Sequence, residues 1–536
     1  MKKITMTFAL IVIAAMMAQS CQKEDLAGSS DVDQDFDAAY ISLTIDSPST
    51  RAATSEDDDG KTEDGSGDEN KIYSIALLAF DINYDYIAAY QEYVSDDGTT
   101  FNCEVAPDAR RFFAVVNPTA EIWAKINEVA SLSQSSFSNL PAIELTAASV
   151  STENYIGNNS ANENRGFTMV NCGSKNTSGI LLESLVTTDV LSDDEEYPTK
   201  LTISVDRLVS KFNYSVSNAF NVNEGNGSVL GVALTATNKA SYLYSMILTD
   251  ALDGGNVYRT DHNMAVGQGI LSDADAVRDE LELNFNWLKN GVSATDAAFY
   301  DPGVVEYVLE NTCEPAYSNS NNLTQAIVKA KYNPLMTNGS TLDIGVSWFK
   351  MYTSSDDGTL YLTFDEVVNL YKGTTSSHYS FTAGDETKAS MDVQLNKIMG
   401  TTGKTWADSD VTLTALDKCA YGGYNAATVA KETDYVLQYY QNAINYYDIF
   451  IQHDDSQDIG HAGRWGMVRN NSYTMDITGI SGEGLPYIPD PTDPEIVDPE
   501  NQDPSDPEPA DKLNAFITVS ISVNPWVMWY QSSTLE

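Results

Sequence analysis

The chain is poor in cysteine, in histidine and in basic residues. Its 536 residues include 5 Cys, 4 His and 30 Lys or Arg, against 77 Asp or Glu. The formal net charge of -47 opposes nucleic-acid binding, because neutralising a phosphate backbone needs clustered Lys and Arg. The sequence therefore predicts a strongly acidic surface and no nucleic-acid partner.

The few cysteines exclude a zinc cluster and a redox motif. Four of them lie far apart and form no CxxC pair: Cys103, Cys172, Cys313 and Cys419. Zinc and redox sites need cysteines at short, fixed spacings. In an exported protein disulfides are permitted, and the pairs Cys103–Cys172 and Cys313–Cys419 would keep each bridge within one domain. Other connectivities of the four remain open.

Catalytic and metal-binding patterns are also missing. Residues 400–405 resemble a P-loop, but Ile398 stands where the first glycine belongs. Residues 479–483 lack the second glycine of a nucleophile elbow. His453 and His461 are too far apart in sequence for a short helical metal motif. We therefore expect no enzyme, no catalytic residues, no metal and no cofactor.

The chain has one long apolar run, and it lies at the N-terminus. Lys2 and Lys3 precede the apolar residues 4–18, a length that suits a secretory signal better than a membrane span. The run ends in Ala18-Gln19-Ser20-Cys21, and small residues before a cysteine are typical of a bacterial lipoprotein signal. We expect a signal peptide over 1–20 and acylation of Cys21. Cleavage nearby, as in an ordinary signal peptide, is the alternative.

A strand pattern follows the signal. Three apolar residues alternate with Ser42 and Thr44, as in a half-buried strand: Ile41, Leu43 and Ile45. A Pro/Ser-rich peptide comes next, in which Arg51 precedes Ala52. An exposed peptide of this kind is accessible to an Arg-specific protease. We predict a propeptide over 21–51, cleavage between Arg51 and Ala52, and removal of the strand that precedes the cut.

The interior of the chain is β-rich. Residues 72–80 form an apolar run that suits a strand buried on both faces. Further segments have strand patterns: 112–116, 201–205, 359–364 and 446–451. Residues 281–288 have a helical pattern, and the Asn/Gly-rich stretch 221–231 indicates a domain boundary. The predicted fold is mainly β with some α, in an N-terminal domain over 52–220 and a C-terminal domain over 221–485.

The C-terminal end combines a spacer with a strand. Residues 486–511 hold eight of the 17 prolines among Asp and Glu, which favours an extended, charge-stiffened spacer. In residues 512–536, four branched apolar residues alternate with hydroxyl side chains: Ile517, Val519, Ile521 and Val523. Asn524-Pro525-Trp526 interrupts this strand pattern. One alternative is that the strand folds back into its own second domain.

The two end strands together indicate a means of assembly. Both present branched apolar residues on one face and hydroxyls on the other. If cleavage removes the first strand, the sheet exposes unpaired backbone groups that need a replacement. The C-terminal strand of another subunit can supply it by strand addition. Such a contact, repeated head to tail, does not close on itself and produces a filament.

Three C-terminal segments carry a family resemblance. Residues 463–473, the Asp-Pro ladder of 486–509, and Val523-Asn524-Pro525-Trp526 resemble the C-terminal region of Bacteroidales fimbrial subunits, the fimbrillins of type V pili. The likeness is greatest to the shaft subunit of the short, or minor, fimbriae. The resemblance implies two transthyretin-like β-sandwich domains in tandem.

The resemblance also implies a sequence of export, proteolytic processing and assembly. The subunit would be exported as an outer-membrane lipoprotein acylated at Cys21, cut by an Arg-specific protease at Arg51-Ala52, and polymerised by donor-strand exchange. Its partners would be identical subunits and accessory tip and anchor subunits, in a surface fimbria that supports adhesion and biofilm formation. Two alternatives remain: a fimbrial tip adhesin, and a monomeric surface lipoprotein that binds glycans.

Overall fold

The computed structural model describes the globular part of the chain. The chain divides into two units, Met1–Asp37 and Ala38–Glu536, and every described residue belongs to the second. The described residues are 38–46, 63–65, 67–83, 85–93, 100–131, 144–146, 156–159, 164–171, 186–242, 246–250, 256–260, 274–289, 299–313, 318–353, 359–363, 366, 435–454, 460–492 and 516–527.

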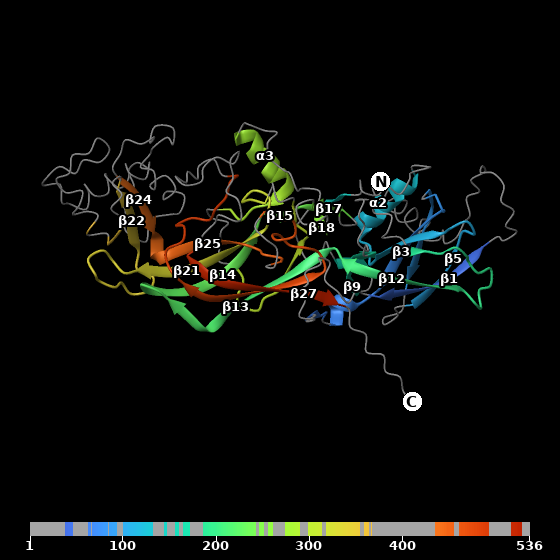
Figure 1. Ribbon diagram of the computed structural model, residues 1–536, viewed down its shortest axis with the longest axis horizontal. Helices are drawn as coiled ribbons and strands as arrows, with labels where there is room; N and C mark the ends of the chain where they lie inside the picture. Colours follow the sequence, from blue (N-terminus) through green and yellow to red (C-terminus); the bar gives the residue numbers. More distant parts are fainter. Residues whose placement is uncertain are drawn as a thin grey trace, which may run out of the picture. The chain divides into compact units, whose positions relative to one another are not determined.

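The first large sheet contains eight strands (Figure 1). Seven of them follow the order β4-β3-β6-β10-β12-β1-β5, and β11 pairs with β6. Their bounds are β1 Ala39–Asp46, β3 Ser74–Phe80, β4 Tyr86–Tyr93, β5 Thr100–Val105, β6 Arg111–Val116, β10 Met169–Asn171, β11 Val186–Thr187 and β12 Thr199–Arg207.

Apolar side chains cover both faces of this sheet. On one face, Ile122 and Ile126 of helix α2 (Ala120–Ser131) pack against Leu78 and Phe113. On the other face, strands from the two ends of the sheet share one core. The Tyr90 hydroxyl of β4 accepts a hydrogen bond of 2.9 Å from the backbone nitrogen of Ala106, just after β5. The sheet therefore curls so that its inner face is enclosed.

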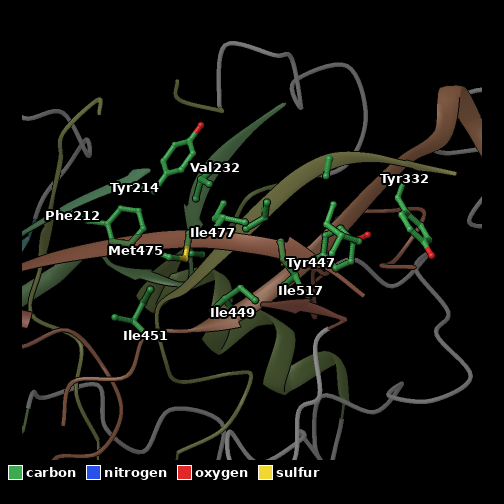
Figure 2. Packing of buried hydrophobic residues seen from close by; sticks show 14 of the residues in the cluster. Phe212, Tyr214, Val232, Tyr332, Tyr447, Ile449, Ile451, Met475, Ile477 and Ile517 are labelled. Carbon is green, nitrogen blue, oxygen red and sulfur yellow. The ribbon is translucent and has the colours of Figure 1, made fainter. Parts of the chain in front are cut away.

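The second core lies between two further sheets. A five-stranded sheet has the order β2-β27-β26-β13-β20, and a three-stranded sheet has the order β14-β21-β25. Figure 2 shows side chains of this core, including Met475, Ile477 and Ile517 of the five-stranded sheet and Val232, Tyr447 and Ile449 of the three-stranded sheet. The bounds are β2 Glu63–Asp64, β13 Val209–Val222, β14 Gly225–Thr235, β20 Glu306–Leu309, β21 Gln325–Pro334, β25 Ile444–Phe450, β26 Asn471–Ile480 and β27 Ile517–Val527.

Smaller elements complete the fold. A three-stranded sheet consists of β23 (Thr359–Leu362), β22 (Trp348–Thr353) and β24 (Tyr435–Tyr440), and Trp348 stacks on Tyr440 with ring centroids 3.9 Å apart. The remaining elements are β7 Glu144–Thr146, β8 Ile156–Asn159, β9 Asn164–Phe167, β15 Thr237–Asn238, β16 Ala240–Tyr242, β17 Met246–Asp250, β18 Asn256–Thr260, β19 Phe285–Asn286, helix α3 Ala274–Asn284, and the 3-10 helices η1 Gly67–Asn70 and η8 Gln441–Ala443.

The predicted class, mainly β with some α, is confirmed. The apolar run at 72–80 forms β3, whose residues from Ile75 to Phe80 are all buried. The helix expected over 281–288 lies earlier, because α3 ends at Asn284 and Phe285 begins β19. The Asn524-Pro525-Trp526 interruption is not present in the backbone: β27 continues through it to Val527. Proline is tolerated there because the strand has little pairing on its outer side.

The change from one sheet to the other occurs at Leu208. β12 ends at Arg207 in the eight-stranded sheet, and β13 begins at Val209 in the five-stranded sheet. The division into domains over 52–220 and 221–485 stays a prediction, and β13 lies on both sides of its boundary. Residues 486–492 of the expected spacer pack into the fold, with Tyr487 and Ile488 buried; residues 493–511 lie outside the described residues.

Candidate assembly site

β1 fills a slot inside the first sheet. It pairs in parallel with β12 from Ile41 to Asp46 and antiparallel with β5 from Ala39 to Thr44. Both edges of the strand are therefore hydrogen-bonded through its centre. We call the space between β12 and β5 that β1 occupies the β1 slot.

The inward side chains of β1 are completely enclosed. Ile41 and Leu43 are 0% exposed and Ile45 is 1% exposed. They belong to the core shared with Ile203 of β12 and Phe101 of β5. Ser42 and Thr44 lie on the other face and are half-buried, and the Thr44 Oγ1 atom is 3.2 Å from Thr100 Oγ1 of β5. The alternation predicted from the sequence is therefore the alternation that the fold uses.

Loss of β1 would leave a strand-shaped vacancy. Among the described strands, β5 pairs with β1 alone, so both β5 and β12 would gain a free edge. Unpaired strand edges and exposed apolar surface are costly in water and favour pairing with another chain. The β1 slot therefore has the chemistry of an acceptor for an alternating strand.

The C-terminal strand lies in its own second sheet. β27 pairs antiparallel with β26, from Ile517 opposite Ile480 to Pro525 opposite Asn471. Ile517 and Val523 are 6% exposed and contribute to the second core, whereas Val519 and Ile521 are only half-buried. β27 is thus held less completely than β1, because two of its four inward side chains retain contact with water.

The outer edge of β27 has one short partner. β2 pairs with it in parallel, with Glu63 opposite Trp526 and Asp64 opposite Val527. From Ile517 to Pro525 no described strand pairs with this edge. β2 begins at Glu63, about a dozen residues after Arg51, so a segment that follows the expected cut pairs with the end of the expected donor strand.

A buried polar cluster anchors the segment that follows β2. The Glu69 carboxylate accepts a hydrogen bond from the Tyr307 hydroxyl and lies 3.4 Å from the Lys211 ammonium. The Arg207 guanidinium donates to the Glu69 carbonyl at 3.2 Å and to Asn70 Oδ1 at 2.7 Å. Buried groups satisfied in this way fix the local backbone. The chain is therefore held to the fold from η1 onward.

The stretch at 463–473 joins several elements. Arg469 pairs with Glu310 at 2.8 Å, with both side chains almost fully buried, and donates to Ser241 Oγ at 3.2 Å. Asn470 Nδ2 donates to Asp206 at 3.1 Å, next to the crossing between the large sheets. Gly466 has φ +108, and a Cβ there would lie 2.4 Å from the Asn311 carbonyl. These residues therefore serve the fold of the C-terminal half.

A turn after β26 holds the start of β27. The backbone nitrogens of Ser481 and Gly482 donate to the Phe516 carbonyl at 2.8 and 3.3 Å. The next residue, Glu483, pairs with Lys350 at 2.8 Å and accepts a hydrogen bond of 2.8 Å from the Tyr361 hydroxyl. Burial raises the pKa of the Glu483 carboxyl, but Lys350 and Tyr361 outweigh it, and the net pKa lies below its ordinary value.

The contacts of His453 are structural. His453 is buried, and its Nδ1 atom is 2.8 Å from the Tyr473 hydroxyl, which also accepts a hydrogen bond of 2.7 Å from the Val468 nitrogen. Within the described residues no group of three or more His, Cys, Asp or Glu side chains is placed to hold a metal ion. No helix in the described part of the chain is long and apolar enough to cross a membrane.

Several predicted positions lie outside the described residues: Cys21, Arg51, Ala52, Cys172 and Cys419. Cys103 is buried in β5, opposite Ile41 of β1. Cys313 is also buried, with its sulfur 3.4 Å from Ser318 Oγ. The pairs Cys103–Cys172 and Cys313–Cys419 therefore stay predictions, as do acylation of Cys21 and cleavage at Arg51.

The sequence did not reveal the surroundings of the two end strands. The walls of the β1 slot come from β5 and β12, which lie about 60 and 160 residues further along the chain, and only folding brings them together. β2 lies in an acidic stretch, residues 56–70, that contains almost no apolar side chains. Two-residue pairing leaves no periodicity, so no local signal identified it.

The C-terminal residues match a known family. Residues 438–532 match the family model described as "Major fimbrial subunit protein type IV, Fimbrillin, C-terminal". The matched segment includes β25, β26 and β27. The resemblance to fimbrial subunits is thus confirmed. A search of curated protein sequences finds no match.

Solved structures of low sequence identity are also similar to this chain. A fimbrilin from Porphyromonas gingivalis W83 is 15% identical, with 92% of this chain and 99% of that chain covered and a TM-score of 0.37. A putative cell adhesion protein from Parabacteroides distasonis is 11% identical, with 91% and 99% covered and a TM-score of 0.40. The tip fimbrial protein Mfa3 from Porphyromonas gingivalis, truncated at its C-terminus, is 11% identical, with 91% and 100% covered and a TM-score of 0.30.

Proposed function

We propose that this chain, whose C-terminal region is that of the fimbrillin family, is the structural shaft subunit of a bacterial surface fimbria. It is exported as a lipoprotein precursor, held at the outer membrane by acyl chains on Cys21 and cut by an Arg-specific protease between Arg51 and Ala52. The cut subunits polymerise by donor-strand exchange and support adhesion and biofilm formation. Accessory tip and anchor subunits complete the fibre.

One observation carries the proposal: the strand just before the expected cut is an interior strand of a sheet. β1 ends at Asp46, five residues before Arg51. Cleavage there leaves β1 attached to the subunit only by non-covalent contacts, since the peptide bond to the rest of the fold is gone. Its departure opens the β1 slot, in which a new strand gains hydrogen bonds on both edges.

The difference in burial between β1 and β27 favours the transfer of β27 from its own subunit to the β1 slot of the next one. In its own sheet β27 has a long free outer edge and two half-buried inward side chains. In the β1 slot the equivalent inward positions are almost fully buried. Completing the burial of one aliphatic side chain contributes about 1 kcal/mol, and pairing of the second edge adds to this. A donated strand is therefore held more firmly by the next subunit than by its own.

Proteolysis of the purified precursor tests this function. Treatment with an Arg-specific protease should convert monomers into filaments visible by electron microscopy. An Arg51→Ala precursor, treated alike, should stay monomeric because β1 remains joined to the chain. Cut native protein that stays monomeric would refute polymerisation by strand exchange.

A matched pair of substitutions tests the role of β27. Ile521 is one of its inward residues and Ser520 is exposed on the other face. Ile521→Asn should abolish filament growth, because an unpaired amide in the apolar slot is costly, whereas Ser520→Asn should assemble at the native rate. Ile521 is only half-buried in its own subunit, so thermal unfolding should show both variants folded. Normal filaments from Ile521→Asn would exclude β27 as the donor.

The two alternatives give other outcomes in the same experiments. A tip adhesin needs an acceptor slot but no donor, so its assembly with other subunits would tolerate Ile521→Asn. A monomeric glycan-binding lipoprotein would form no filaments after cleavage. The 11-residue β27, presenting four apolar residues on one face, favours the shaft.

A further inference from the structure

The segment around the start of β27 closely matches the sequence of β1. Residues 39–46 read AYISLTID and residues 515–522 read AFITVSIS. Alanine and two isoleucines are identical in this alignment, and the other inward position exchanges leucine for valine. The aromatic residue and the two hydroxyl residues are also kept. The two segments therefore share both the alternation and the approximate sizes of their side chains. This similarity indicates that both fit the same site.

Alternation by itself leaves the register of an inserted strand open. A strand can shift by two residues and still present its apolar face to the core. The size of the side chain restricts the register at the first position of the β1 slot, which is occupied by Ala39. This position is closed, since Ala39 is 3% exposed. A shift that placed Ile517 there would add three carbon atoms to a closed position, and overpacking of this kind destabilises a core. The aligned register instead places Ala515 at this position.

The same alignment fixes the direction of the strand. With its residues in the order of β1, the donated segment runs parallel to β12 and antiparallel to β5. Ile517 then takes the place of Ile41, Val519 that of Leu43, and Ile521 that of Ile45. Phe516, which is 53% exposed in its own subunit, takes the place of half-buried Tyr40.

We infer that residues 515–522 of one copy enter the β1 slot of the next copy in the direction and register of β1. The inference rests on the proposed function and specifies the partner segment of the same site. Ser520 of the donor lies at the Thr44 position, directly opposite Thr100 of the acceptor. Thr518 lies at the Ser42 position, opposite Asn102.

Disulfide trapping in filaments tests the register. Ser520 and Thr100 are both exposed, so cysteine at either position should leave the subunit folded. Directly opposite residues on antiparallel strands have Cβ atoms about 5 Å apart, whereas a shift of two residues separates the two Cβ atoms by about 7–8 Å, beyond the roughly 3.5–4.5 Å that a disulfide spans. Filaments of Ser520→Cys/Thr100→Cys should therefore become covalent ladders on a non-reducing gel after mild oxidation.

Matched pairs distinguish the other registers. Ser522→Cys/Thr100→Cys and Thr518→Cys/Thr100→Cys should give no more ladder than native filaments, while Thr518→Cys/Asn102→Cys should link. The uncut Ser520→Cys/Thr100→Cys precursor should not link, because Thr44 lies beside Thr100. Linking through Ser522, or filaments that link in none of the pairs, would overturn the register. Absence of filaments from cut native protein would instead refute the proposed function.

Discussion

At the residue scale, buried charges hold distant segments of the fold together. Arg469 and Glu310 form an ion pair in which both side chains are almost inaccessible to water. Glu69, Lys211 and Arg207 form a second buried group beside the crossing between the large sheets. Desolvated charges need their partners, since a lone charge in the interior is much less stable than a paired one. These residues therefore fix the frame in which the end strands are held.

The Arg469–Glu310 pair provides a stability prediction. Arg469→Met leaves the Glu310 carboxylate buried without its counter-ion and should lower the free energy of unfolding by about 3–5 kcal/mol. The double variant Arg469→Met/Glu310→Leu should recover much of this loss, because no isolated charge remains. Urea unfolding at neutral pH measures both. Equal stability of the single variant and the native protein would contradict the structural role of the pair.

Glu483 provides a pH prediction. Its pKa lies below the ordinary value of 4.5, since Lys350 and Tyr361 outweigh the effect of burial. The stabilisation from this group is therefore complete above the unfolded-state pKa and is lost as pH falls through the lower folded-state pKa. Urea unfolding between about pH 6 and pH 3 should show a smaller loss of stability for Glu483→Gln than for the native protein. The exposed substitution Glu195→Gln should follow the native curve.

At the element scale, the two end strands differ in how many neighbours they have. β1 lies between two strands of its sheet, whereas β27 has β26 on one side and the two residues of β2 on the other. An interior strand loses its pairing on both edges when it leaves, and while it remains part of the chain it stays at high local concentration beside its slot. An edge strand separates from one long partner only. This difference suits one strand to removal by proteolysis and the other to exchange.

Deletion of residues 514–536 is the prediction at this scale. Because β27 lies near the edge of the sheet, the truncated subunit should fold and remain soluble, with a loss of about 2 kcal/mol for each of the buried Ile517 and Val523. It should not extend filaments after cleavage. Deletion of 529–536, which leaves β27 complete, is the control. An unfolded 514–536 deletion would show that β27 is required by its own core.

At the scale of the whole molecule, charge governs how subunits approach one another. Residues 1–51 contain 4 basic and 7 acidic residues, so a chain cut after Arg51 would retain 26 basic and 70 acidic residues, a net charge of -44. Like-charged subunits repel, and salt screens this repulsion over about 10 Å at 0.1 M. Filament growth, followed by light scattering, should accelerate from low salt to about 0.15 M NaCl. A rate independent of ionic strength would contradict repulsion as the limiting factor.

The sequence anticipated the end strands better than their surroundings. Alternation at Ile41, Leu43 and Ile45 and at Ile517, Val519 and Ile521 is a local property, so it was visible without the fold. The extent of β27 was misjudged at Pro525, because a proline breaks a central strand and is tolerated near an edge. Whether a strand lies at an edge depends on distant segments, and no local pattern records it.

Sequence by itself determined the acidity of this protein, the alternation of its two end strands, and the near copy of β1 at residues 515–522, since each is a property of consecutive residues. Only the tertiary structure decided that β1 is enclosed between β5 and β12 and that β27 rests on β26 beside β2. The physical reason is that pairing and burial are relations between segments far apart in the chain. Two strands of similar sequence thereby acquire different positions: β1 is interior and paired on both edges, whereas β27 lies near an edge and keeps two inward side chains half-buried.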